Sequence, residues 1–142
     1  MDENNEKIAL AYALAAYAHR DQKDKAGRPY IEHPVKVCEG VTGEDEKIVA
    51  LLHDVLEDTF VQETTIRNLF GDEIADAVIA MTRVTGENYM DFIRRCRENP
   101  LARTVKLADL AHNMDLSRLE NVSEKDLERL EKYRKARALL LE

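Results

Sequence analysis

The segment LLHDVLEDT, residues 51–59, places an imidazole and three carboxylates among apolar side chains that belong in a protein core. His53 and Asp54 are adjacent, and each is followed four residues later by a carboxylate, in Glu57 and Asp58. On a helix this spacing brings side chains onto neighbouring faces, so the four groups are expected to lie close together. Carboxylates held this close repel one another and raise one another's pKa unless a cation lies among them. The segment therefore predicts a site for a divalent metal ion.

Two other segments offer further ligands. YIEHPVKV contains His33, and VKLADLAHNMDLSRL places Lys106, Asp109 and Asn113 at i, i+3 and i+7, which is one face of a helix. Asp109 also falls on an apolar stripe of that helix, so we expect a buried carboxylate. Burial of a carboxylate without a partner is costly. This residue therefore predicts a cation nearby.

The candidate ligands form a mixed nitrogen and oxygen set. They are His33, His53, Asp54 and Asp109. Without thiolates, such a set suits Mn, Fe, Mg or Zn. A single histidine or aspartate on a helix is more often a hydrogen-bonded core residue or a surface residue, and Glu57 with Asp58 also fits a solvated helix end. The residue types alone leave both interpretations open.

Length and composition indicate one globular domain. The chain has 142 residues, of which 44% are hydrophobic and 35% charged. No apolar run approaches the roughly 20 residues of a membrane span, and the acidic start MDENNEK lacks the features of a signal peptide. Two cysteines, Cys38 and Cys96, do not favour a disulfide scaffold. We therefore expect a cytoplasmic protein that does not bind a membrane.

The formal net charge of −7 gives no basic footprint for nucleic acid, so no nucleic-acid partner is expected. An acidic surface repels a polyanion, and any anionic ligand must be met by a local positive site or a metal.

Apolar spacing is helical nearly throughout, which predicts an all-α fold of about seven or eight helices. The whole chain, 1–142, is expected to be one domain, with its motifs within about residues 8–120. One helix is predicted to run through His53 to about Leu56. Ser123, followed by Asp126 three residues later, resembles a capping box that opens a last helix over about 123–142. The residues predicted to face inward on this helix are Leu127, Leu130, Tyr133, Ala136 and Leu140.

Three motifs occur in order along the chain: HRDQKDKAGRPYIEHPVKV, LLHDVLEDT and VKLADLAHNM. Together they resemble the hydrolase domain of the RelA/SpoT homologues, within the HD phosphohydrolase superfamily. HD alone is a weak signal, whereas HP, then HD-x-x-ED, then K-x-A-D-x-x-H-N at fitting separations is specific. The resemblance covers nearly the whole chain and implies an HD-domain helical bundle. The length is similar to that of a stand-alone small alarmone hydrolase, without room for the synthetase domain of larger members.

The resemblance implies a role for each matching residue. The implied metal ligands are His33, His53, Asp54 and Asp109, with Mn²⁺ the usual ion of the family. Glu57 and Asp58 match the pair that positions and activates the attacking water. The implied reaction is release of pyrophosphate from the 3′ position of guanosine tetra- or pentaphosphate.

Substrate contacts are implied in the same way. Lys25 matches a basic residue of the substrate loop, and Asn113 matches an asparagine near the ribose or the 3′-pyrophosphate. Lys106 lies inside a matched motif and offsets phosphate charge. Tyr89 is expected to line the pocket or to pack in the core, and Arg118 is expected to contact a phosphate.

One position departs from the family pattern. Asp24 stands where family members have an arginine associated with the guanine base, and a carboxylate cannot stack on a base as a guanidinium does. Asp24 instead suits hydrogen bonds from a base edge. Two alternatives therefore stay open: an HD phosphohydrolase acting on another phosphorylated nucleotide, such as NADPH or a nucleoside monophosphate, and a catalytically silent nucleotide-sensing module. The sequence does not determine the oligomeric state.

Overall fold

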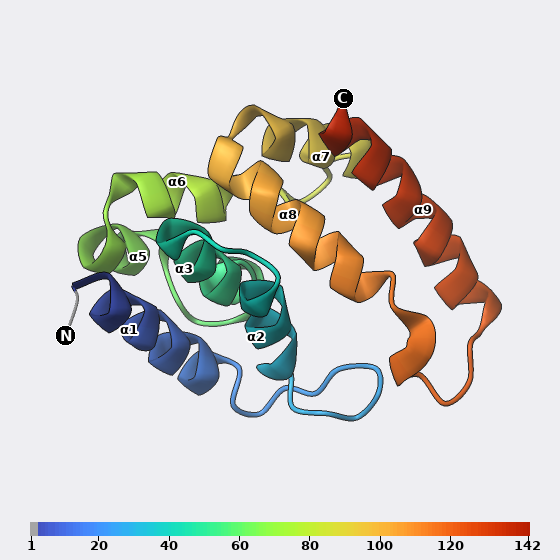
Figure 1. Cartoon of the computed structure of the whole chain (residues 1–142), viewed down its shortest axis with the longest axis horizontal. Helices are drawn as coiled ribbons and strands as arrows, with labels where there is room; N and C mark the ends of the chain where they lie inside the picture. The colour runs from blue at the N-terminus through green and yellow to red at the C-terminus, as the bar shows by residue number, and fades with distance from the viewer. Residues whose placement is uncertain (1–2) are drawn as a thin grey trace.

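The computed structural model describes the backbone of residues 3–142 and all their side chains except those of residues 3, 4 and 118. The elements in chain order are α1 (Glu3–Ala18), α2 (Glu32–Glu39), α3 (Glu44–Leu52), α4 (Val55–Asp58), α5 (Glu63–Phe70), α6 (Asp72–Ala80), α7 (Tyr89–Glu98), α8 (Pro100–Asn113), the 3₁₀ turn η1 (Leu116–Arg118) and α9 (Glu124–Leu141). Within these residues no β-strand occurs, and the predicted all-α fold is confirmed (Figure 1).

Helix α3 lies at the centre of the molecule. Its last five residues, Ile48 to Leu52, are all buried, as expected for a helix surrounded by others. It packs against α1, α2, α6 and α8. His53 directly follows this core helix, so the core fixes the position of its imidazole.

Helix α8 is the second central element, and it contacts α2, α3, α6, α7 and α9. It begins at Pro100, whose fixed φ suits the first turn. The side chain of Asn99 caps the helix by accepting a hydrogen bond from the backbone N–H of Ala102 at 3.0 Å. In Figure 1 α8 separates α1, α2 and α3 from α9, so it presents one face to each side.

The chain between His53 and Val55 differs from the prediction of one continuous helix. Helix α3 ends at Leu52, a turn contains His53 and Asp54, and the short helix α4 follows. The Nδ1 of His53 binds the carbonyl oxygen of Ala50 at 2.6 Å, which is the oxygen that a continuing helix would offer to the amide of Asp54. The side chain thus competes with the helix, and the break aims His53 and Asp54 at a common point.

The loop between α1 and α2 is held by local bonds. Asp24 Oδ1 accepts hydrogen bonds from the backbone N–H groups of Ala26 at 2.9 Å and Arg28 at 3.0 Å. Lys23 pairs with Pro29 in an antiparallel bridge, and Gly27 has a φ of 81°, which a residue with a side chain rarely adopts. The carboxylate of Asp24 therefore builds the loop.

Helix α9 begins with the predicted capping box between Ser123 and Asp126. Ala136 and Leu140 are buried, as expected, but Leu127 is 53% exposed. The prediction was wrong for Leu127 because the first turns of α9 extend past the core toward the end of the molecule where the α1–α2 loop lies (Figure 1).

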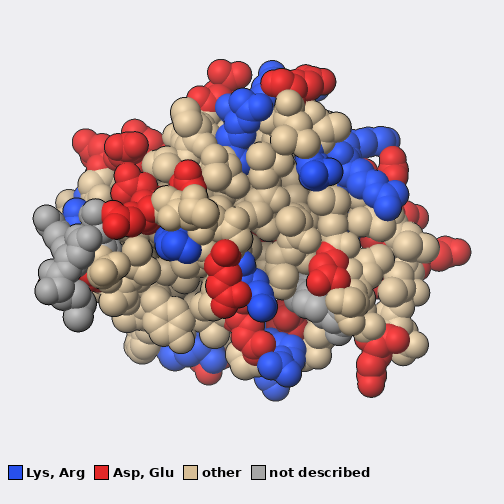
Figure 2. All heavy atoms as spheres, viewed as in Figure 1, with Lys and Arg blue, Asp and Glu red and all other residues tan. Residues whose placement is uncertain are grey.

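Acidic and basic side chains are mixed over the face shown in Figure 2. Among residues 3–142, no helix is both long and apolar enough to cross a membrane.

Candidate metal centre and cleft

Three buried side chains from three helical segments meet at one point. His33 comes from α2, His53 follows α3, and Asp109 comes from α8. Each offers a ligand atom within 4.8 Å of those of the other two. Asp109 Oδ1 lies 2.8 Å from His33 Nε2 and 3.4 Å from His53 Nε2. The core thus brings together three residues that sequence analysis selected as metal ligands.

The imidazole of His53 is oriented to offer a lone pair to a cation. Its Nδ1 donates to the carbonyl oxygen of Ala50, so in the neutral ring Nε2 carries no proton. Nε2 is buried and lies 3.0 Å from Asp54 Oδ2 and 3.4 Å from Asp109 Oδ1. Among the described residues, no group forms a hydrogen bond of good geometry with this nitrogen. A nitrogen lone pair facing two carboxylates fits a shared divalent cation, and metal-binding histidines commonly donate their other N–H to a carbonyl.

The pKa of His53 supports the same reading of this position. Complete burial would lower it, but the charges of Asp54 and Asp109 outweigh burial and raise the pKa well above its ordinary value. The point between these three side chains therefore attracts a positive charge, which can be a proton or a metal ion.

His33 is oriented by a residue that sequence analysis did not select. Its Nδ1 lies 2.6 Å from Nδ1 of His112, and one of the two donates to the other. If His33 supplies the proton, its Nε2 is left as an acceptor that points at Asp109. His112 lies three residues after Asp109 on α8, so helical spacing from Asp109 was the available signal.

Asp109 is held by its own helix. Lys106 Nζ donates to its Oδ2 at 2.8 Å, and the side-chain amide of Asn113 donates to its Oδ1 at 3.2 Å. Burial would raise the pKa of Asp109, but Lys106 and His53 outweigh burial and hold that pKa well below its usual range. The predicted face that Lys106, Asp109 and Asn113 share is thus present, with a buried carboxylate that stays ionised.

Asp54 lies at the edge of the buried group, with its side chain 18% exposed. It accepts a hydrogen bond from the phenol of Tyr30, which lies in the α1–α2 loop. Burial would raise its pKa, but His53 outweighs burial and lowers the pKa to about 2. Asp54 therefore faces both the buried ligands and the solvent side of the site.

Glu57 and Asp58 lie beside Asp54 on the solvent side, and each of the three offers an oxygen within 4.8 Å of the others. Partial burial raises the pKa of Glu57, assisted by the charges of Asp58 and Asp54, although a bond from the Arg83 amide opposes this. Burial and the charge of Asp54 also raise the pKa of Asp58. Two carboxylates with raised pKa values next to a candidate metal centre are suited to accept a proton.

Five of these groups line a cleft of about 400 Å³: His33, Asp54, Glu57, Asp58 and Asp109. Its far wall comes from α9 and η1, including Leu116, Asp126, Arg129 and Tyr133. Across the cleft, Lys25 lies 3.8 Å from Asp126, which also pairs with Arg129 at 3.3 Å. Cationic side chains from the loop and from α9 therefore meet an acidic centre, an arrangement that fits an anionic ligand with a cation beneath it.

The predicted substrate residues reach the cleft to different extents. Its lining includes Lys25, Lys106, Asn113 and Asp24. Tyr89 is not among the lining residues; its ring packs 6.1 Å from that of Phe92, with Lys132 Nζ 4.0 Å from the centre of the Tyr89 ring. The side chain of Arg118 lies outside the described residues. Sequence analysis missed Tyr30, although it lies three residues before His33 in YIEHPVKV, and it missed Arg129, which lies on a helix that carries no proposed metal ligand.

Comparisons with known proteins find a matching family model and several relatives. A family model described as HD domain matches residues 11–140. A GTP pyrophosphokinase of Myxococcus xanthus is 33% identical over 148 aligned positions, which cover 91% of this chain and 19% of that protein. A guanosine-3′,5′-bis(diphosphate) 3′-pyrophosphohydrolase of Aquifex aeolicus is 36% identical over 124 positions, which cover 79% of this chain and 18% of that protein. The chain thus spans about a fifth of the length of these curated relatives.

A solved structure also matches along nearly the whole chain. It is described as a metazoan orthologue of SpoT that hydrolyses ppGpp, and it shares 27% sequence identity with a TM-score of 0.75. The match covers 95% of this chain and 85% of the solved one.

Proposed function

This chain belongs to the HD domain family, as its motifs predicted, and on that premise we propose that it is a metal-dependent phosphohydrolase that releases pyrophosphate from the 3′ position of guanosine tetra- or pentaphosphate. The observation that carries the proposal is the buried Nε2 of His53 next to the carboxylates of Asp54 and Asp109, which line a cleft together with cationic side chains. The named activities of the pyrophosphohydrolase relative and of the SpoT orthologue support the choice of substrate.

The metal ligands in this proposal are His33, His53, Asp54 and Asp109. Nitrogen and oxygen donors without thiolate suit Mn²⁺, which we propose as the ion; Fe, Mg and Zn accept the same donors. When bound, a divalent cation neutralises the carboxylates and polarises a phosphoryl oxygen.

Glu57 and Asp58 are proposed to take the proton from the attacking water. The water oxygen bonds to the 3′-linked phosphorus, the bond from phosphorus to the ribose 3′ oxygen breaks, and the ribose oxygen takes up a proton. The raised pKa values of both carboxyl groups suit this exchange, since each can accept a proton and release it again.

Cations of the cleft are proposed to hold the phosphates. Lys25 and Arg129 face each other across Asp126, and Lys106 projects from α8 beside Asp109. Asn113 supplies an amide near the ribose in this assignment. The described contacts of Tyr89 are with Phe92 and Lys132, which fits its alternative role in the core. A phosphate contact of Arg118 remains part of the proposal, and its side chain lies outside the described residues.

A second candidate is the same chemistry on another phosphorylated nucleotide, such as NADPH or a nucleoside monophosphate. It is favoured by Asp24, whose carboxylate is engaged with the backbone of its own loop and supplies no guanidinium for a guanine base. A silent nucleotide-sensing module is the less favoured alternative, because all six proposed metal and proton-transfer residues are retained at the site.

The test of the function is a product analysis. The purified protein is incubated with Mn²⁺ and, separately, with ppGpp, NADPH and a panel of nucleoside phosphates. Release of GDP and pyrophosphate from ppGpp is the expected result. Turnover of a different nucleotide would support the second candidate, and no turnover of any would favour the sensing module.

Variants test the roles of the residues separately. His53→Ala and Asp109→Ala are each expected to abolish metal binding, since each removes a ligand at the buried point. Glu57→Ala is expected to retain the metal and lose turnover. Metal content of the purified variants and product release are measured together. Full metal occupancy in both ligand variants would refute the metal site, and full activity of Glu57→Ala would refute its proton-accepting role.

A further inference from the structure

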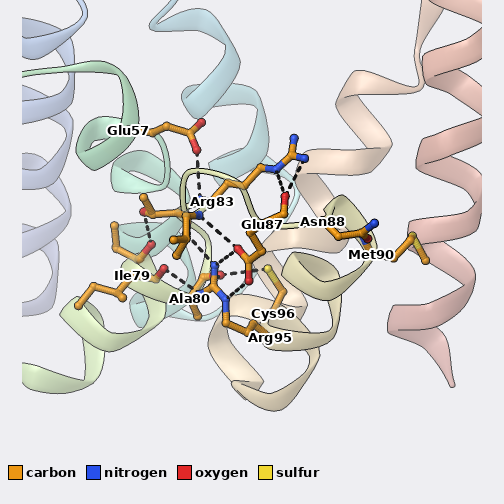
Figure 3. A network of polar contacts seen from close by, with 12 residues as sticks. Glu57, Ile79, Ala80, Arg83, Glu87, Asn88, Met90, Arg95 and Cys96 are labelled. Atoms are coloured by element: carbon orange, nitrogen blue, oxygen red, sulfur yellow. Dashed lines mark hydrogen bonds and ion pairs between the residues drawn. The ribbon is translucent and has the colours of Figure 1, made fainter.

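We propose that Arg95, acting through Glu87 and the loop between α6 and α7, positions the Glu57 carboxylate for reaction. The inference rests on the proposed role of Glu57 and extends it to a residue outside the cleft. Arg95 lies on α7 and does not belong to the cleft lining, so it is a positioning residue with no contact to the substrate. Figure 3 shows the network from Glu57 to Arg95.

The network begins at an exposed carboxylate that needs an external support. Glu57 lies on the four-residue helix α4, too short to hold it firmly, beside the negative charges of Asp54 and Asp58. Its Oε1 accepts a hydrogen bond from the backbone N–H of Arg83 at 3.1 Å, across 26 positions of sequence. This bond engages one carboxylate oxygen of Glu57, a residue that also lines the cleft.

The Arg83 amide is itself held by the loop around Glu87. The guanidinium of Arg83 donates two hydrogen bonds, at 3.2 and 3.0 Å, to the backbone carbonyl of Glu87. The backbone N–H of Val84 donates to Glu87 Oε1 at 3.2 Å. Glu87 thus holds the loop in two ways: its backbone carbonyl binds the Arg83 side chain, and its carboxylate binds the Val84 amide.

Arg95 anchors this loop to the core. Its guanidinium makes two hydrogen bonds of 2.7 Å to the Glu87 carboxylate and one of 2.9 Å to the carbonyl of Thr82. Thr82 directly precedes Arg83, so the bond to its carbonyl holds the backbone next to the Arg83 amide. The ion pair with Glu87 holds the opposite end of the same loop. Arg95 lowers the pKa of Glu87 to about 2, so the pair stays charged at physiological pH.

The geometry requires a guanidinium. Arg95 binds the two oxygens of one carboxylate and a carbonyl at once with its planar fork, whereas an ammonium is a point charge that cannot reproduce this arrangement. A displacement of about 1 Å in a reacting group can reduce the rate about 100-fold. Loss of the anchor is therefore expected to reduce kcat without changing the metal site.

The first experiment compares Arg95→Ala, Arg95→Lys and the matched control Arg94→Ala, an exposed arginine on the same helix that pairs with Asp91. For Arg95→Ala we expect kcat to fall about 10- to 100-fold with KM and Mn²⁺ content unchanged. Arg95→Lys should show a similar loss of kcat, and Arg94→Ala should have the kcat of the native chain. Native kcat in a folded Arg95→Ala protein would overturn the proposal.

A double-mutant cycle connects the effect to Glu57. The cycle is measured on the residual turnover of Glu57→Ala. Adding Arg95→Ala should not lower this residual rate further, because the carboxylate that Arg95 positions is absent. Losses that multiply would show that Arg95 acts by another route and would overturn the proposal. If Glu57→Ala alone keeps full activity, the proposed role of Glu57 fails instead, so the two failures are distinguishable.

A second measurement does not depend on turnover or on correct identification of the substrate. Hydrogen exchange of the Arg83 amide, followed by NMR, should accelerate at least tenfold in both Glu57→Ala and Arg95→Ala, while amides of α8 keep their native rates. Unchanged exchange at Arg83 in either variant would overturn the proposal. Should Arg95→Ala fail to fold, Arg83→Pro removes the amide proton that Glu57 accepts. Native kcat in a folded Arg83→Pro protein would refute the positioning role.

Discussion

At the scale of single residues, the candidate site depends on the groups that orient the proposed metal ligands as much as on those ligands. His112 is the clearest example, because its Nδ1 lies 2.6 Å from Nδ1 of His33. With His33 as the donor, the contact holds the ring with Nε2 toward Asp109. Partners of this kind set both the tautomer and the direction of a ligating imidazole.

We therefore expect His112→Ala to lower the affinity for Mn²⁺ about 10- to 100-fold without abolishing binding. Titration calorimetry of the native and variant chains, with circular dichroism to verify folding, measures the effect. His53→Ala serves as the reference for complete loss. An unchanged dissociation constant in His112→Ala would show that His33 is oriented by its other neighbours.

Residues that share a helix could be predicted from the sequence, and contacts between distant segments could not. Lys106, Asp109 and Asn113 were expected on one face because a regular helix converts spacing into direction, and the hydrogen bonds among them agree. Tyr30 and Asp54 come from different segments, and their contact depends on how the α1–α2 loop folds back over the site. No local pattern encodes that path.

At the scale of elements, the carboxylate of Asp126 connects α9 with the α1–α2 loop across the cleft. Asp126 Oδ1 lies 3.8 Å from Lys25 and 3.3 Å from Arg129, while its Oδ2 accepts hydrogen bonds from the backbone and hydroxyl of Ser123. One side chain therefore both caps α9 and neutralises two cations that face the cleft.

Asp126→Asn should separate these roles, because an amide oxygen can still accept a bond from Ser123 but carries no charge. We expect KM for a phosphorylated substrate to fall about twofold to fivefold at low salt, since two cations gain free charge, with kcat unchanged. Steady-state kinetics at low and high ionic strength measures this, and added salt should erase the difference. A rise in KM with a folded α9 would show instead that Asp126 holds the cations in place for the substrate.

A second prediction concerns the junction of α5 and α6. Gly71 ends α5 and precedes α6 with φ 94° and ψ 170°, a region open almost only to glycine. A methyl group here would meet no atom within 4 Å, so the cost is conformational strain alone. Gly71→Ala should destabilise the fold by about 1–3 kcal/mol, measured by urea unfolding. Because α5 supplies no residue to the cleft, kcat/KM of the folded protein should not change, and unaltered stability would mean that the junction relaxes.

The start of the last helix was predicted well because its cap is local. Ser123 and Asp126 lie three residues apart, and the capping box that they form at the start of α9 is present. The break after Leu52 was missed, because a buried imidazole competes there with the helix for the carbonyl of Ala50. Periodicity carries no information about such a side-chain bond, although this break is what aims the ligands.

At the scale of the whole molecule, the proposed metal site and the C-terminal helices are connected through α8. This helix supplies Asp109 to the site and packs on its other sides against α7 and α9. Cys96 of α7 is fully buried away from the cleft, donates to the carbonyl of Ala80 at 3.2 Å, and has a pKa that burial raises to about 11. Its thiol is thus protonated and covered in the native state, and it can react only when the surrounding structure opens.

If the domain unfolds as one unit, metal binding should slow the reaction of Cys96 with a thiol reagent, although the thiol lies away from the proposed metal site. A ligand that binds only the native state shifts the opening equilibrium by 1 + [L]/Kd, so Mn²⁺ at 100 times its dissociation constant should slow labelling of Cys96 about 100-fold. The rate is measured with a thiol reagent at pH 8 on Cys38→Ser protein, in which Cys96 is the single thiol. In a His53→Ala background the rate should not respond to Mn²⁺. Labelling of metal-loaded protein at the metal-free rate would show that α7 and α9 open independently, and that α8 separates two units of different stability instead of joining them.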